Sequence, residues 1–186
     1  MKKVLIIFTI LLTIAGCSAN NAEIATPFEH TLFITKEDLT STNLSKFHYV
    51  ENQDTSNHWK QNERHKNDTF NGTINIYPNK NIEPLSDYIL IDVFARENNS
   101  VAQEDLEVRI MVNSTISPNL QKNYQNLGDE NFYYTIQDDN ENLAYIAMRK
   151  EKYIITIQAV SLQSSDTAER EIKELAQLYL EKISKL

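Results

Sequence analysis

The pattern of apolar and polar positions is clearest at the end of the chain, where it predicts a long amphipathic helix. From Ala168 to Leu186 apolar residues recur every three or four positions, which places them on one face of a helix for about five turns. Asp166, with Glu169 three residues later, has the spacing of a capping box and predicts the helix start. Such an apolar stripe needs another layer to cover it, so we expect this helix to form part of the core.

Several other segments have the apolar patterns of β-strands. Tyr88–Ala95 is apolar on both faces, which is typical of a central strand covered on both sides. Further strands are predicted at His30–Ile34, Phe47–Val50, Phe70–Tyr77, Leu106–Val112, Phe132–Ile136, Leu143–Met148 and Tyr153–Val160. The last three are joined by short polar segments and therefore predict an antiparallel meander.

Two shorter helices are expected between these strands. Thr35 and Asp38 have the spacing of a capping box and predict at least one helical turn toward Leu44. Ser117-Pro118 is typical of a helix start and Gly128 of a helix stop, so a short helix is predicted between them.

Strands followed by one long amphipathic helix define an α+β fold, with a mainly antiparallel sheet packed by the C-terminal helix. This order of elements is similar to that of the PsbP-like α/β/α sandwich, and also to the sheets of the cystatins and of the nuclear transport factor family. Residues 28–186 are expected to form a single globular domain. A chain of this length buries about two-thirds of its unfolded surface and can fold without disulfides.

The N-terminal residues have the pattern of a bacterial export signal. Lys2 and Lys3 precede an apolar run, Val4–Ile14, that is too short to cross a bilayer as an untilted helix. The quartet Ile14-Ala15-Gly16-Cys17 then resembles the lipobox of bacterial lipoproteins, and Cys17 is the only cysteine of the chain. The resemblance implies that residues 1–16 are cleaved and that Cys17 carries a diacylglycerol. Residues 17–27 would then tether the domain to the outer side of the cell membrane.

The charge balance is acidic. The chain has 26 Asp and Glu against 18 Lys and Arg, and cleavage before Cys17 would leave 16 basic residues and a net charge of −10. This balance argues against nucleic acid as a partner, because binding it needs clustered Lys and Arg, and against electrostatic adhesion to anionic lipid. Membrane residence is therefore expected to come from the lipid on Cys17.

Candidate functional side chains gather in residues 51–72. The stretch holds His58, Trp59, Glu63 and His65 but no Leu, Ile or Val, so a solvent-facing loop is expected. Six residues separate the two histidines, which does not match the i, i+4 pair of a helical zinc site, and no metal is predicted there. Trp59, together with His58 and His65, is the candidate contact for a partner or a sugar.

Other patterns that resemble functional motifs have structural explanations. Asp138–Asn142 begins like a calcium loop, but Leu143 stands where the turn needs glycine and Arg149 where a bidentate Glu is needed, so a hairpin turn is expected. His30 and His48 lie in apolar segments and are expected at the edge of the core. Several aromatic residues are expected to pack in the core rather than form an exposed platform: Phe132, Tyr133, Tyr134, Tyr145 and Tyr153.

No catalytic constellation or cofactor site emerges from the sequence. There is no Gly-x-Ser-x-Gly elbow, and three glycines in the whole chain exclude a Gly-rich phosphate loop. The pattern therefore favours a lipid-anchored binding or accessory protein of the cell envelope, which contacts a protein, peptide or glycan through a sheet face or residues 51–72. The alternative is a cell-envelope hydrolase with His58 or His65 as general base beside Glu63 or Asp54.

Overall fold

The computed structural model describes residues 29–44, 46–60, 68–79, 87–137 and 141–186. Its centre is a seven-stranded antiparallel sheet with the strand order β1-β2-β3-β7-β6-β5-β4. The strands are β1 (Tyr49–Asp54), β2 (Phe70–Tyr77), β3 (Tyr88–Ala95), β4 (Gln121–Lys122), β5 (Glu130–Gln137), β6 (Asn142–Lys150) and β7 (Tyr153–Ser161). The helices are η1 (Glu29–Leu32), α2 (Lys36–Thr40), α3 (Ser56–Lys60), α4 (Asn99–Ile116), η3 (Tyr124–Asn126) and α5 (Ser165–Ile183).

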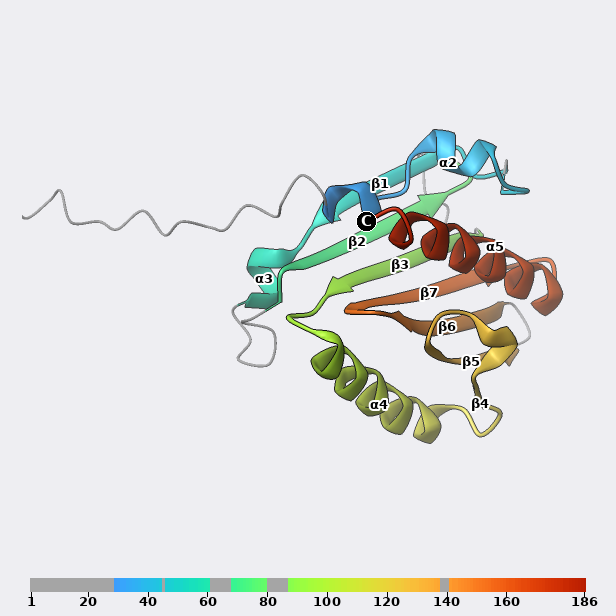
Figure 1. Ribbon diagram of the computed structural model, residues 1–186. Coiled ribbons are helices and arrows are strands. Elements are labelled where there is room, and N and C mark those ends of the chain that lie inside the picture. Colours follow the sequence, from blue (N-terminus) through green and yellow to red (C-terminus); the bar gives the residue numbers. More distant parts are fainter. Residues whose placement is uncertain (1–28, 45, 61–67, 80–86, 138–140) are drawn as a thin grey trace, which may run out of the picture.

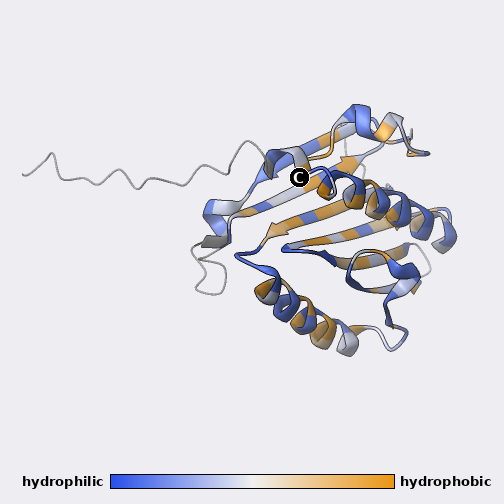
Figure 2. Cartoon of the chain, in the orientation of Figure 1, coloured by the Kyte–Doolittle hydropathy of each residue, from blue (hydrophilic) through white to orange (hydrophobic). Residues whose placement is uncertain are grey.

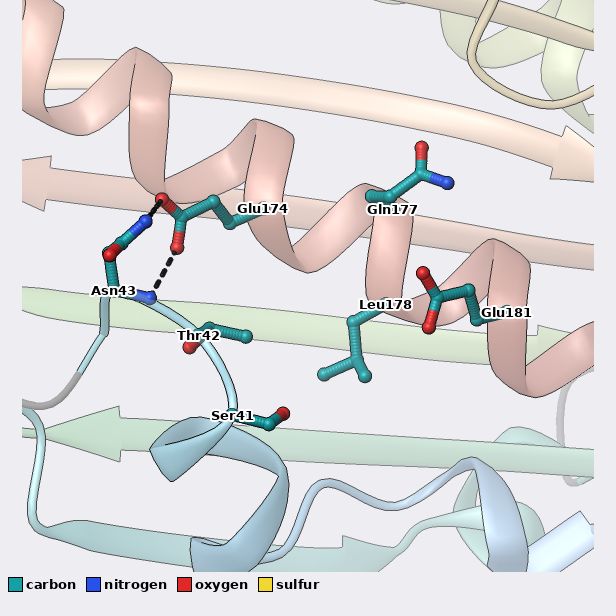
Figure 3. Close-up of a pocket in the computed structure, with 7 residues that line it drawn as sticks. All are labelled: Ser41, Thr42, Asn43, Glu174, Gln177, Leu178 and Glu181. Atoms are coloured by element: carbon teal, nitrogen blue, oxygen red, sulfur yellow. Dashed lines mark hydrogen bonds between the residues drawn. The ribbon is translucent and has the colours of Figure 1, made fainter.

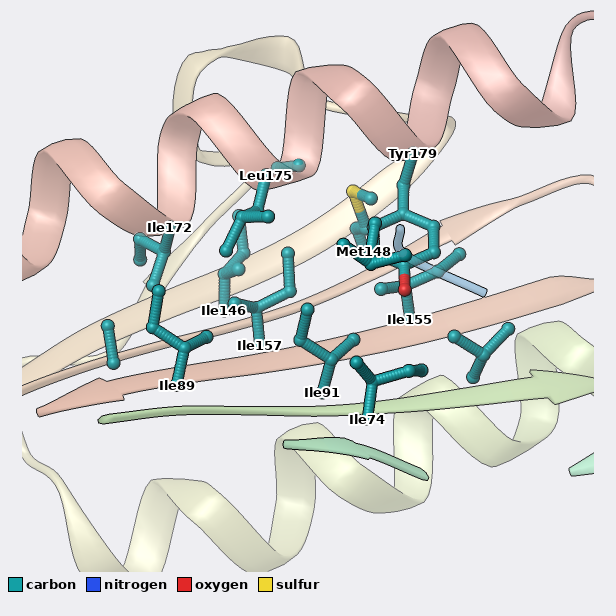
Figure 4. Packing of buried hydrophobic residues seen from close by; sticks show 14 of the residues in the cluster. Ile74, Ile89, Ile91, Ile146, Met148, Ile155, Ile157, Ile172, Leu175 and Tyr179 are labelled. Carbon is teal, nitrogen blue, oxygen red and sulfur yellow. The ribbon is translucent and has the colours of Figure 1, made fainter. Parts of the chain in front are cut away.

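The two long helices, α4 and α5, lie on opposite faces of the sheet and give an α/β/α sandwich (Figure 1). We call the face under α5 the first face and the face under α4 the second face. The large core between α5 and the first face includes Ile74, Ile89, Ile91, Ile146, Met148, Ile155, Ile157, Ile172, Leu175 and Tyr179 (Figure 4). Burying each large apolar side chain is worth about 1.5–3 kcal/mol, so α5 is a structural layer. The predicted α+β fold is confirmed.

The start of α5 differs from the sequence prediction. Ser164 is the N-cap, and its hydroxyl accepts a hydrogen bond from the Thr167 amide at 3.2 Å. The predicted pair of Asp166 and Glu169 forms no capping box, because the Glu169 carboxylate binds Tyr124 and Lys173 instead. A cap needs only one suitable side chain, and the serine two residues upstream of Asp166 provides it.

The strand predicted at Leu106–Val112 is wrong, since these residues belong to α4. Asn98 caps this helix through a hydrogen bond from the Val101 amide. The buried positions, Ala102, Asp105 and Leu106, have helical spacing. One of them is charged, so the helical period is hidden when only apolar residues are counted, and the alternation downstream resembles a strand.

The helix predicted between Ser117 and Gly128 is also wrong. This segment contains the short strand β4 and the single turn η3, and its backbone repeatedly enters the left-handed region. The positive φ angles are those of Asn123 (53°), Gln125 (52°), Asn126 (53°) and Gly128 (76°). A helix cannot continue through such residues.

The N-terminal part of the described chain forms helical turns rather than the strand predicted at His30–Ile34. The capping box predicted at Thr35 and Asp38 is confirmed, because each side chain accepts a hydrogen bond from the other's amide. Both His30 and His48 are exposed. The His30 ring lies against the edge of the core, with its centre 5.5 Å from that of Phe33, whereas His48 lies just before β1.

The remaining strands follow the sequence pattern. β2 and β3 have the predicted bounds, and β5, β6 and β7 form the predicted antiparallel meander. The turn predicted at Asp138–Asn142 lies largely outside the described residues. The strand predicted at Phe47–Val50 begins two residues later and runs to Asp54, because an edge strand can carry polar residues on positions that face solvent.

Candidate functional site

The side chains selected from residues 51–72 do not form one solvent-facing loop. β1 occupies residues 51–54, α3 carries His58 and Trp59, and β2 begins at Phe70. His58 is exposed, while Asp54 lies 3.4 Å from the imidazole of His30. Among the described residues, no group of three His, Cys, Asp or Glu side chains is placed to hold a metal ion. Glu63, His65 and Cys17 lie outside the described residues.

The second face of the sheet carries polar and aromatic side chains in cross-strand rows. In β1 and β2, Tyr49 lies opposite Tyr77 and Glu51 opposite Asn75. Continuing the register of β2 and β3 by one residue brings Tyr88 beside Tyr77. Three tyrosines from three strands therefore form one row across the sheet.

α4 covers the part of this face that β5, β6 and β7 and the end of β3 form. Leu106 packs with Phe132, Tyr134 and Ala147 in one cluster, and a second cluster joins Ala102 to Phe94 and Ile154. Toward β1 the side chains of the second face are half-exposed or exposed. We call this area the open half, and its residues are Tyr49, Glu51, Thr73, Asn75, Tyr77, Tyr88, Leu90, Asp92 and Gln158.

Hydrogen bonds between strands fix the polar side chains of the open half. The Asp92 carboxylate accepts bonds from the hydroxyls of Thr73 at 2.8 Å and Thr156 at 3.5 Å, one from each neighbouring strand. The Gln158 amide donates to the Tyr88 hydroxyl at 3.2 Å. Each carboxylate oxygen can accept more than one bond, so Asp92 keeps the capacity to bind a ligand hydroxyl.

The phenols of Tyr77, in the open half, and of Tyr145, at its border, are neutral at physiological pH. Burial raises the pKa of Tyr77, and the neighbouring charge of Glu51 raises it further. Burial also raises the pKa of Tyr145, at the border with α4, to about 12, and Arg109 opposes that shift. A neutral phenol can both donate and accept a hydrogen bond and presents an apolar ring face.

The position of α4 beside the open half is fixed by a buried ion cluster. Arg96, directly after β3, binds Asp105 of α4 through Nε at 3.1 Å and Nη2 at 2.5 Å, and it also binds Asp68. Arg109 of α4 binds Asp105 in turn and lies over the Phe94 ring, 4.5 Å from its centre. The border of the open half is therefore held by charge as well as by packing.

A hollow of about 290 Å³ lies on the other side of the molecule, between α5 and the turn that follows α2 (Figure 3). Asn43 donates to Glu174 from both its backbone and side-chain nitrogens, each at 2.9 Å. Leu178, Gln177 and Glu181 line the rest. Both carboxylate oxygens of Glu174 bind the turn after α2 to α5. We therefore interpret this hollow as the packing boundary between these two segments.

The aromatic residues of β5, β6 and β7 are mostly buried. Tyr133 and Tyr153 belong to the core under α5, whereas Phe132, Tyr134 and Tyr145 pack with α4. The row of Tyr49, Tyr77 and Tyr88 was not identified from the sequence. The available signal was the polar side of β2, where Thr73, Asn75 and Tyr77 alternate with buried residues.

The fold and this face define the protein as an α/β/α sandwich with one helix-covered and one partly open sheet face. The crystal structure of the extracellular domain of PknH from Mycobacterium tuberculosis has a similar fold, with a TM-score of 0.54 and 9% sequence identity. The match covers 84% of this chain and 95% of that one, and it shows the fold alone. No protein-family model and no curated protein matches the sequence. None of the described helices is long and apolar enough to span a membrane.

Proposed function

We propose that the protein is a lipid-anchored binding module on the outer side of a bacterial cell membrane, and that the open half binds a glycan. The lipobox that ends at Cys17 supports the anchor. The extracytoplasmic location is supported by the export signal and by the likeness of the fold to an extracellular domain.

The tyrosine row of the open half is the observation that carries the glycan proposal. The rings of Tyr49 and Tyr77 stack with their centres 6.4 Å apart, and Tyr88 follows on the next strand. Aromatic rings pack on the apolar faces of sugar rings, while sugar hydroxyls need donors and acceptors at the edges. Asn75, Gln158 and Asp92 supply amide and carboxylate groups beside the row.

A rigid sheet suits this role. The side chains of the open half project from paired strands, and the bonds of Asp92 to Thr73 and Thr156 restrict its rotamers. Little conformational entropy is then lost on binding, which favours affinity for a flexible, polar ligand. His58, the candidate base of the hydrolase alternative, lies on α3, and Glu63 and His65 lie outside the described residues.

Titration with a soluble N-acetylglucosamine tetramer, followed by calorimetry, tests the proposal on the mature chain. The variant Tyr77→Ala should raise the Kd about fivefold, because losing one stacked aromatic contact costs about 1 kcal/mol. Gln177→Ala, an exposed change on α5, is the matched control and should bind as the parent does. Absence of tetramer binding, or equal Kd values for all three proteins, would contradict the proposed ligand.

A further inference from the structure

The C-terminal half of α4 exposes large apolar side chains on the side that faces away from the sheet. Met111 is 63% exposed, Val112 49% and Ile116 57%. Apolar positions along α4 are visible as orange bands in Figure 2. We call these three residues the apolar strip. Clustered exposed apolar residues on one helix commonly mark a contact surface.

The same part of the chain lacks negative charge. From Val108 to Gly128 there is no Asp or Glu, and these 21 residues form the longest such stretch after Cys17 in a chain with 26 acidic residues. Two cations, Arg109 and Lys122, lie within it. Lys122 pairs with Phe132, which is covered by α4, so its side chain belongs to the second face as well.

We propose that the apolar strip rests on the anionic lipid surface to which the protein is anchored. This inference depends on the proposed lipid on Cys17. Residues 18–28 reach at most about 40 Å when fully extended, so an anchored domain stays close to the bilayer. The second contact is then intramolecular, and a weak surface affinity is enough to orient the domain.

Charge favours lipid as the occupant of the strip. The mature chain carries a net charge of −10, so most of its surface is repelled by an anionic leaflet. Glu104 and Glu107 are exposed on the first half of α4, but residues 108–128 carry no carboxylate, so the C-terminal end of the helix can approach such a leaflet with less repulsion, and its apolar residues can enter the interface. The net charge of the mature chain opposes electrostatic adhesion of the domain as a whole. The absence of carboxylates from residues 108–128 nevertheless permits contact at the C-terminal end of α4.

The orientation has a consequence for the proposed binding surface. α4 lies on the second face, so a domain that rests on the strip turns the open half toward the membrane (Figure 1). The distance between sheet and lipid is then set by the helix, whose diameter is about 10–12 Å. A glycan carried near the lipid headgroups would be within reach of the tyrosine row.

A single spin label tests the contact in the full lipidated protein. Because Cys17 is the only cysteine and its thiol would carry the lipid, Val112→Cys supplies a unique labelling position, and Gln177→Cys on α5 is the matched control. The protein is reconstituted in vesicles of phosphatidylglycerol and phosphatidylethanolamine. We expect oxygen to relax the label at 112 more strongly than a water-soluble nickel complex does, with the reverse order at 177.

Further measurements separate the outcomes. Adding Ile116→Glu to this labelled protein should make the nickel complex relax the label at 112 more strongly than oxygen does, which is the behaviour of a label in water. Circular dichroism should show an unchanged fold. Aqueous behaviour at both positions in the acylated parent would overturn the contact. A doubled mass in detergent with a protected label at 112 would show that a second copy covers the strip and would overturn it too. If mass spectrometry finds no diacylglycerol on Cys17, the anchor fails and the inference with it.

Discussion

Arg96 and Asp105 form a buried ion pair that joins the end of β3 to the first half of α4. The Nη2 to Oδ2 distance is 2.5 Å, and the two residues are 1% and 7% exposed. Asp68 binds the same guanidinium, so one cation connects three separate segments of the chain. One buried cation therefore helps to hold α4 on the second face, together with the packing of Ala102 and Leu106.

Replacing this cation should destabilise the fold strongly. Arg96→Met would leave Asp68 and Asp105 buried without their shared cation, and such a change typically costs about 3–5 kcal/mol. Urea unfolding of parent and variant measures the loss. Arg170→Met removes an exposed arginine of α5 and should change stability by no more than about 0.5 kcal/mol. Similar losses in the two variants would show that the cluster does not hold α4.

The same ion pair explains why α4 was not predicted from the sequence. α5 and β3 are recognisable because most of their buried positions are apolar and repeat with one period, although α5 also buries Glu171. The inner side of α4 includes Asp105, whose burial is compensated by Arg96, a residue outside the helix. Apolar periodicity reports only local order, so it does not predict a helix that is held in place by an ion pair with a residue outside it.

The open half could not be predicted from the sequence for a related reason. Tyr49, Tyr77 and Tyr88 come from three strands, and only the register of the sheet places them in one row. The polar side chains of residues 51–72 are close in sequence, yet they lie on different elements, with Asp54 at the end of β1 and His58 on α3. Proximity along the chain is a poor guide to a site built across a sheet.

Gly128 is expected to tolerate no side chain. Its φ is +76°, and a Cβ atom there would lie 2.5 Å from the Arg149 carbonyl oxygen. Gly128→Ala should therefore cost about 1–3 kcal/mol in the free energy of unfolding, measured with urea. Gln125→Gly is the opposite change in the same loop, because Gln125 has a φ of 52° that glycine adopts without strain. It should keep or raise stability, and a loss in Gln125→Gly would contradict this explanation.

Membrane attachment should depend on Cys17. No other part of the sequence after residue 17 has an apolar run long enough to hold the chain in a bilayer, so Cys17→Ser is expected to release the protein from membranes. Fractionation after a salt wash measures the effect. Ser18→Ala, beside the proposed lipid, is the control and should remain in the membrane fraction. A Cys17→Ser variant that sediments with the membranes as fully as the parent would place the anchor elsewhere.

The contact of Glu169 with the loop after β4 should make part of the stability dependent on pH. Its carboxylate accepts a hydrogen bond from the Tyr124 hydroxyl and pairs with Lys173 at 2.6 Å, while the Tyr124 ring stacks on Tyr133 with the centres 4.2 Å apart. Partial burial raises the pKa of Glu169, but the contacts with Lys173 and Tyr124 outweigh it. The pKa therefore lies below its ordinary value of 4.5.

A lowered pKa in the folded state means that this carboxylate stabilises the protein above about pH 4.5 and that the contribution is lost as the pH falls through the folded-state pKa. Glu169→Gln should thus cost about 1 kcal/mol at pH 7, and the difference from the parent should shrink between pH 5 and pH 3. Urea unfolding at each pH measures it. Glu181→Gln, an exposed change on the same helix, should show no such trend. A difference for Glu169→Gln that stays constant with pH would mean that its charge contributes nothing to the contact.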